Sequence, residues 1–287
     1  MTVELLNFYN FFFIVAAFAI LIGLYFALRN RSERIKTIVV FALLLSNLIL
    51  HFLKIHFPPY STDPNKAARD IWFINICAVS VLTFPIFYIS KNKTLKDYMF
   101  YLGALSGFLA LVYPTEALGK ELVFDVWRFY YCHIVIFVAP ILMVLLKIHE
   151  LDYRRIWRIP FVMSAVLLFI MVQQVLQAEL GIISLRSDDF FDINVHNPSL
   201  IWGPGNEEVA GIIKVFTPDF LTKVPFGEFK GETKYWPFFW MLPFMTIVFA
   251  VFPFLMCLPW EWEHIVSDFQ KLFKKKEAEE IIELEKM

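Results

Sequence analysis

The sequence has 287 residues, of which 59% are hydrophobic and only 18% are charged, and 33 are Phe. A soluble domain of this size needs a more highly charged surface, so the composition indicates an integral membrane protein. The formal net charge of −1 gives no reason to expect nucleic acid as a partner, and three cysteines are too few for a disulfide framework.

Seven stretches are apolar and long enough to cross a bilayer as helices, which takes about 20 residues each. In chain order they cover residues 7–28, 36–56, 72–90, 97–113, 127–147, 157–178 and 236–260. The fourth stretch is the shortest, and the first is too long for the core of a signal peptide. The sequence therefore predicts an all-α fold, a polytopic membrane bundle of about seven transmembrane helices in a domain covering residues 1–260.

Basic residues are concentrated in every second connection, which predicts the orientation. The first, third and fifth connections carry Arg29, Arg31, Arg34 and Lys36, then Lys91, Lys93 and Lys96, then Lys147, Arg154, Arg155 and Arg158. The second and fourth connections are poorer in basic residues. Since basic loops stay in the cytoplasm, we expect an N-outside/C-inside multi-pass protein of the plasma membrane.

Two segments lie outside this pattern. Residues 179–235 form a long outer loop with turn signals at Asn197-Pro198 and Gly203-Pro204, and a connection of this length is typical of a lid. Residues 261–287 place apolar side chains at helical spacing beside three consecutive lysines. This favours a cytoplasmic amphipathic and basic tail on the inner leaflet, although a solvated charged tail fits its last ten residues equally well.

Polar side chains inside spans are costly and are therefore the first candidates for a functional site. The predicted orientation places such residues of four spans at one depth, toward the outer face, and we expect them to line a common interior pocket. They are Asn47 and His51 in the second span, Asn75, Cys77 and Ser80 in the third, Arg128, Cys132 and His133 in the fifth, and Gln173 and Gln177 in the sixth.

A thiol with a histidine in reach is the minimum set for thiolate chemistry, because the imidazole can accept the thiol proton. Cys77 can form this pair with either His133 or His51. Cys132 points about 100° away from the neighbouring His133 around the helix. The alternative for each cysteine is a small packing residue, and this is the expected role of Cys257.

Other classes of protein find little support. Residues 236–260 contain no Lys for a retinal Schiff base, and no phosphate-binding or dinucleotide-binding glycine pattern occurs. No spacing of His, Cys and carboxylates resembles a known metal site, His51 and His56 included. We therefore expect neither a metal nor a cofactor.

Several segments between residues 75 and 144 resemble the YwaF-like integral membrane proteins of bacteria, which are themselves similar to the eukaryotic transmembrane protein 164 group. The segments are Asn75-Ile76-Cys77, Tyr101-Leu102-Gly103, Ser106 to Leu111, Tyr113-Pro114, Phe129 to His133 and Val138-Ala139-Pro140, with Asn197-Pro198 and Gly203-Pro204 in the outer loop.

This resemblance implies a cysteine-dependent phospholipid acyltransferase in which Cys77 is the acyl-accepting nucleophile and His133 its base. One departure concerns the position after the cysteine, where the eukaryotic pattern has His and this chain has Ala78.

Three functional hypotheses follow. The first is acyl transfer between membrane phospholipids and lysolipids, in which Asn75 or Gln173 donates a hydrogen bond to the oxyanion. The second is a carrier or binding protein for a small solute, and the third is a non-catalytic scaffold or sensor. Membrane lipids are the expected partners, and the sequence predicts no oligomeric state.

Overall fold

The computed structural model describes residues 2–185, 197–205 and 207–285, and within them the regular structure is helical apart from two isolated β-bridges. In this part of the chain, six helices are long and apolar enough to cross a membrane, and a seventh is apolar but shorter. The predicted all-α membrane bundle is confirmed at this level. The six are α1 (Phe8–Leu28), α2 (Glu33–Leu53), α5 (Lys93–Val112), α6 (Phe124–Leu145), α7 (Ile159–Glu179) and α9 (Leu242–Glu285).

The short helix is α4 (Ile76–Ile89), which lies in the third predicted stretch, whereas the fourth stretch corresponds to the 20-residue helix α5. At about 1.5 Å per residue, its 14 residues extend roughly 21 Å, less than a hydrocarbon core of about 30 Å. The helix begins only at Ile76 because Asn75 is extended and caps it. The first residues of the predicted span, 72–75, are therefore non-helical.

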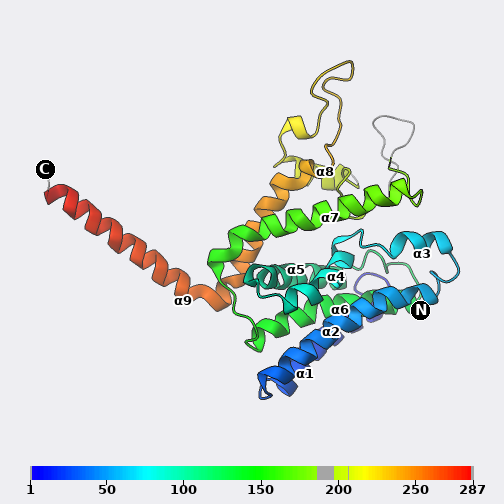
Figure 1. Ribbon diagram of the computed structural model, residues 1–287, viewed down its shortest axis with the longest axis horizontal. Helices are drawn as coiled ribbons and strands as arrows, with labels where there is room; N and C mark the ends of the chain where they lie inside the picture. Colours follow the sequence, from blue (N-terminus) through cyan, green and yellow to red (C-terminus); the bar gives the residue numbers. More distant parts are fainter. Residues whose placement is uncertain (1, 186–196, 206, 286–287) are drawn as a thin grey trace.

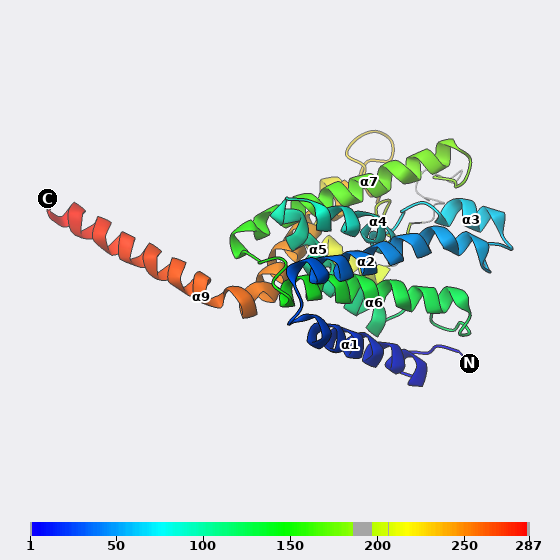
Figure 2. The same cartoon turned by 60° about the horizontal axis from the view of Figure 1, so that its bottom comes forward.

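Helix α6 is the centre of the bundle. It packs against α1, α2, α4 and α5, and Figure 2 shows it between α1 on one side and α2 and α5 on the other. On the α1 side, the rings of Phe13 and Tyr130 stack with their centroids 3.8 Å apart. The fully buried Asn10 donates to the carbonyl of Leu111 (2.8 Å) and to the hydroxyl of Tyr130 (3.2 Å). Polar and aromatic contacts thus hold α1 against the core.

The tightest helix contact is between α5 and α6, at two glycines four residues apart. A Cβ atom at Gly103 would lie 2.6 Å from the carbonyl oxygen of Ile136, and one at Gly107 would lie 2.8 Å from the amide nitrogen of Phe137. Small residues at this spacing let two membrane helices approach at backbone distance. Glycine is required here for packing.

The two ends of the bundle differ. The N-terminus and the short helix α3 (Pro64–Asp70) lie at one end, and the C-terminal half of α9 projects away from the other (Figure 1). The remaining short elements are η1 (Lys54–His56), η2 (Tyr153–Arg158), α8 (Glu207–Lys214), η3 (Asp219–Leu221) and η4 (Phe239–Met241). Since α9 runs unbroken from Leu242 to Glu285, the predicted tail continues the last span as a helix, while its membrane contact stays a prediction.

A buried ion cluster closes the end opposite the N-terminus. Asp97, which is fully buried, accepts hydrogen bonds from His149 (2.7 Å) and from Arg155 (2.5 and 3.0 Å). Next to it, Asp268 of α9 pairs with Arg154 and accepts a hydrogen bond from Tyr153. These contacts join α5, the connection after α6, and α9.

Candidate functional site

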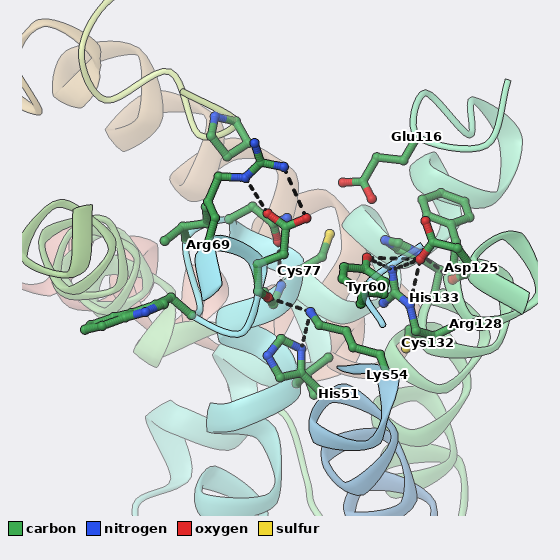
Figure 3. A pocket seen from close by; sticks show the side chains of 18 of the residues that line it. His51, Lys54, Tyr60, Arg69, Cys77, Glu116, Asp125, Arg128, Cys132 and His133 are labelled. Carbon is green, nitrogen blue, oxygen red and sulfur yellow. Dashed lines mark hydrogen bonds and ion pairs between the residues drawn. The ribbon is translucent and has the colours of Figure 1, made fainter. Parts of the chain in front are cut away.

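A cavity of about 450 Å³ opens at the end of the bundle that holds the N-terminus. Its walls come from the end of α2, residues 60–75, the start of α4, the connection before α6 and the first half of α6 (Figure 3). The pocket predicted from the sequence was to be lined by polar residues of four spans, and this cavity contains part of that set. Of the predicted residues it brings together His51, Asn75, Cys77, Arg128, Cys132 and His133.

Cys77 is the second residue of α4 and lines this cavity in a partly exposed position. Asn75 forms the N-cap of the helix, since its Oδ1 accepts a hydrogen bond of 2.6 Å from the amide of Ala78. The first turn of a helix favours negative charge, which is the charge of a thiolate. The amide of Cys77 itself donates to no acceptor among the described residues. This position suits a nucleophilic thiolate.

His133, from α6, presents one ring nitrogen as an acceptor. Its Nδ1 lies 2.7 Å from the carbonyl oxygen of Phe129, which can only accept, so Nδ1 carries the proton and Nε2 carries the lone pair. Within the described residues, Nε2 has no hydrogen-bond partner. A buried imidazole held in this tautomer has the form of a general base.

Cys77 and His133 face the same cavity from α4 and α6 (Figure 3), but no hydrogen bond joins them in the part of the chain that the structure describes. The same holds for Cys77 and His51. Direct pairing of Cys77 with one of the two histidines was the expectation, and it is not observed. Catalytic hydrogen bonds often tighten only when substrate is bound.

His51 is occupied on both nitrogens. Its Nε2–H donates to the carbonyl of Ile71 (2.9 Å), and its Nδ1 accepts from Nζ of Lys54 (3.5 Å). The ring also stacks on Phe73, with centroids 4.5 Å apart. Of the two histidines, His133 is therefore the one with a free lone pair. No group of three His, Cys, Asp or Glu side chains within the described ranges forms a metal site.

The other predicted polar residues bond to backbone. Gln173 accepts from the amide of Phe73 (3.0 Å) and donates to its carbonyl (2.8 Å), and Gln177 donates to the carbonyl of Arg69 (2.7 Å). Ser80 donates to the carbonyl of Ile76 (2.8 Å) and Asn47 to that of Cys132 (3.2 Å). These four do not line the cavity, because non-helical backbone and helix contacts engage their side chains.

The cavity also holds charged residues for which the sequence predicted no role in a site. They are Lys54, Lys66, Arg69, Asp70, Glu116, Lys120 and Asp125, together with the phenol of Tyr60. The sequence signal for them is the clustering of charges in the two short connections before α4 and before α6. The pocket is thus more highly charged than the spans alone suggest.

Two networks organise these charges. The carboxylate of Asp70 pairs with Lys66 (2.8 Å) and Arg69 (2.7 Å). Burial acts to raise the pKa of Asp70, but the hydrogen bonds from these two residues outweigh it and hold the pKa below its usual value. In the second network Arg128 pairs with Asp125 (2.7 Å), which also accepts from the hydroxyl of Tyr60 (3.0 Å).

The phenol of Tyr60 is buried, and burial raises its pKa. It therefore stays a neutral donor to Asp125 at any physiological pH.

A family model, described as the TMEM164 family, matches residues 2–203. This range contains every residue that lines the cavity. No curated protein and no solved structure matches the chain.

Proposed function

The chain belongs to the TMEM164 family of multi-span membrane proteins, and from this premise we propose that it transfers acyl chains between membrane phospholipids and lysolipids, with Cys77 as the nucleophile. The observation that carries the proposal is one cavity holding both Cys77, at the start of α4, and His133, whose Nε2 is free to accept a proton. The chemistry needs both groups.

The first half-reaction acylates Cys77. His133 Nε2 accepts the thiol proton, and the thiolate attacks the carbonyl carbon of a phospholipid ester, so that a C–S bond forms. The ester C–O bond then breaks, and the departing lysolipid alkoxide takes the proton from the imidazolium. In the second half-reaction the hydroxyl of another lysolipid gives its proton to Nε2 and attacks the thioester. The thiolate leaves and is reprotonated.

The oxyanion of each step needs hydrogen-bond donors. Two groups at the start of α4 supply them in this proposal, the amide of Cys77 and the Nδ2 of Asn75, neither of which has an acceptor among the described residues. Gln173, the other candidate from the sequence, is occupied at both ends of its amide by Phe73. The donors thus belong to the same helix turn as the nucleophile.

In this proposal His133 is the base although Ala78, and not a histidine, directly follows the cysteine. Where the eukaryotic pattern has His after the cysteine, this chain presents a methyl group to the cavity, and α6 provides an imidazole on the facing wall. In the proposed reaction the base therefore comes from a different helix.

Part of the long outer loop lies over this end. Pro198 lines the cavity, Ser199 donates to the carbonyl of Ile74 (3.5 Å), and Trp202 donates to Gln174 of α7 (2.8 Å). These contacts support residues 197–203 as the lid that keeps water from hydrolysing the thioester. Residues 186–196 of the predicted lid lie outside the described residues.

The remaining proposals concern the branch of the family, the membrane and the orientation of the chain. The matching segments of the sequence support a place among the YwaF-like bacterial members of the family. The distribution of basic residues supports the plasma membrane, with the cavity on the outer side. Lipid esters would then reach Cys77 from the outer leaflet.

The test is to trap the acyl-enzyme. Purified protein is incubated with phospholipid labelled in its acyl chain, and hydroxylamine-sensitive label on the protein is measured. Wild type is expected to carry label at Cys77, and His133→Gln to form it about 100-fold or more slowly, the usual contribution of a general base. Cys257→Ser is the matched control, because Cys257 is buried in α9 and bonds to the carbonyl of Phe254.

Two outcomes would contradict the proposal. One is full transfer activity in Cys77→Ser. The other is absence of label on wild type under conditions that acylate another family member. A solute carrier would be indifferent to Cys77→Ser, so the same variant separates the two classes of function.

A further inference from the structure

Lys54 is a buried cation without a carboxylate partner. It begins the turn η1 that ends α2, and it is only 4% exposed. Its Nζ donates to the carbonyl of Asp70 (2.6 Å) and to Nδ1 of His51 (3.5 Å). Within the described residues, no carboxylate oxygen lies within 4.0 Å of it. Burying an ammonium without a counter-charge is costly, so its position at the cavity wall needs an explanation.

Hydrogen bonding alone does not provide that explanation. The carbonyl of Asp70 and the ring of His51 are neutral acceptors, which any uncharged donor of similar length would satisfy. His51 is held neutral in this arrangement, since its Nε2 bears the proton given to Ile71 and its Nδ1 must accept. The charge of Lys54 is therefore available to a ligand.

Three cations surround one aromatic ring beside this cavity. The ring centre of Tyr60 lies 5.3 Å from Nζ of Lys54, 5.0 Å from Nζ of Lys66 and 5.6 Å from the guanidinium carbon of Arg128. The ring quadrupole attracts each cation without neutralising it. Lys66 is paired with Asp70 and Arg128 with Asp125, so within the described residues the charge of Lys54 is the one left unbalanced. An anion beside Lys54 would balance it.

The carboxylates that line the cavity are too few to balance the positive charges that line it. Five Lys and Arg side chains line the cavity against three carboxylates. Asp70 is engaged by Lys66 and Arg69, and Asp125 by Arg128 and Tyr60. Glu116 forms no ion pair among the described residues. Figure 3 shows Lys54 and Arg128 on the same side of the cavity, with Tyr60 nearby.

We propose that Lys54 and Arg128, arranged around Tyr60, bind the phosphate group of a phospholipid headgroup. The inference rests on the proposed acyl transfer, because a phosphate held there would place the glycerol esters of the same lipid in the cavity that contains Cys77. A phosphodiester carries one negative charge and several acceptor oxygens, which matches an ammonium and a guanidinium that share one recess.

The experiment measures binding in a Cys77→Ser background, so that its result does not depend on chemistry. The probes are dioctanoylphosphatidylcholine, dioctanoylglycerol of the same acyl length, and sodium phosphate, titrated calorimetrically into the full-length protein in detergent. We expect Lys54→Gln, which keeps a donor for Asp70, to bind the phosphatidylcholine about 10-fold more weakly, the loss typical of one charge-assisted hydrogen bond. Its affinity for dioctanoylglycerol should not change.

Two further variants control for folding and for charge. Lys54→Arg keeps the charge and should retain phosphatidylcholine binding to within about threefold. Lys93→Gln removes an exposed cation at the other end of the bundle and should bind like the parent. Displacement of phosphatidylcholine by sodium phosphate would show that the site accepts the group alone. Loss of binding in Lys54→Gln without such displacement would show that it accepts only the intact lipid.

Equal affinity of the Cys77→Ser parent and Lys54→Gln for phosphatidylcholine would overturn the phosphate site, even if Cys77 proves to be acylated in the trapping assay. Conversely, a charge-dependent lipid affinity without any acyl-enzyme in wild type would leave the phosphate site in place and remove the transferase. The two failures are therefore distinguishable.

Discussion

At the scale of single residues, Asn75 joins structure to chemistry. Its Oδ1 caps α4 through the amide of Ala78, and its Nδ2 has no acceptor among the described residues, beside the cavity that contains Cys77. An N-cap stabilises its helix by about 1 kcal/mol. In this chain the cap also fixes where the helix starts, and so places Cys77 in the first turn. One side chain thereby determines both the position of the nucleophile and a candidate oxyanion donor.

Asn75→Asp separates these two roles. Aspartate caps a helix as well as asparagine does, but it has no amide to donate, so we expect unfolding stability close to wild type and acyl-enzyme formation slower by about 10-fold or more. Asn75→Ala should lower both the unfolding stability and the rate of acyl-enzyme formation. The matched control is Asn92→Ala, which removes the N-cap of α5 at the other end of the bundle. It should cost similar stability, about 1 kcal/mol, and leave the rate unchanged. A normal rate in Asn75→Asp would exclude the donor role.

Five other polar side chains bond to the backbone between the end of α3 and Asn75. Carbonyls at membrane depth cannot be left without donors, so the last carbonyls of α3 and those of the non-helical residues 71–74 have to be satisfied by neighbouring elements. Gln177 donates to the carbonyl of Arg69, Lys54 to that of Asp70 and His51 to that of Ile71. Gln173 donates to the carbonyl of Phe73 and Ser199 to that of Ile74.

This accounts for how far the site could be predicted from the sequence. The polar residues of α2, α4, α6 and α7 were identified, as was the end of the bundle at which they gather. Their hydrogen-bond partners were not, because the break in the third span falls within the apolar run Trp72-Phe73-Ile74, which reads as continuous helix. The N-cap residue Asn75 was the available signal for the break.

At the scale of elements, the contact between α5 and α6 fixes the cavity geometry. The proposed nucleophile is on α4 and the proposed base on α6, and both helices pack on α5. The spacing of α4 and α6 therefore depends on how closely α5 approaches α6. Gly103 and Gly107 set that approach, since each would bring a Cβ atom into the backbone or side chains of α6.

Gly107→Ala tests this dependence. The added methyl group would meet Phe137 at 2.8 to 3.0 Å on both backbone and side chain, so α5 must move away from α6. Overpacking of this kind costs about 1–3 kcal/mol of unfolding free energy, and thermal unfolding in detergent should show a lower midpoint. Gly23→Ala in α1 is the matched control, because nothing lies within 4 Å of the position of its Cβ. Equal midpoints for the two variants would show that the contact tolerates separation.

The sequence predicted the helices themselves well and their packing poorly. Hydrophobic length identifies a span regardless of its neighbours, and six of the seven stretches are long apolar helices in the structure. The extent of α5 was underestimated by its first turn, because that turn contains Lys93 and Lys96. The buried Asp97 is compensated by His149 and Arg155, which lie more than 50 residues away in the sequence. Such partners cannot be identified from local hydropathy.

At the scale of the whole molecule, the two ends of the helix bundle differ in structure. The end with the N-terminus has the cavity, the non-helical residues before α4, and residues 197–203, which contact this end through Pro198 and Ser199. The opposite end is closed by the ion cluster of Asp97 and by the pairing of Asp268 with Arg154, which ties α9 to η2. Because these ion pairs hold the helices together at one end, the helices at the other end can stay apart around the cavity.

The distribution of basic residues predicts how these two ends are oriented in the membrane. The closed end carries the connections that contain Arg29, Arg31 and Arg34, and basic connections are retained in the cytoplasm, so the cavity should face outward. In a background in which Cys77, Cys132 and Cys257 are all replaced by Ser, single cysteines are placed at two exposed positions, Thr62 near the cavity and Arg31 at the closed end. A membrane-impermeant maleimide should label Thr62→Cys in intact cells, and Arg31→Cys only after permeabilisation. The reverse pattern would place the cavity in the cytoplasm, and the proposed lipid substrates would then have to come from the inner leaflet.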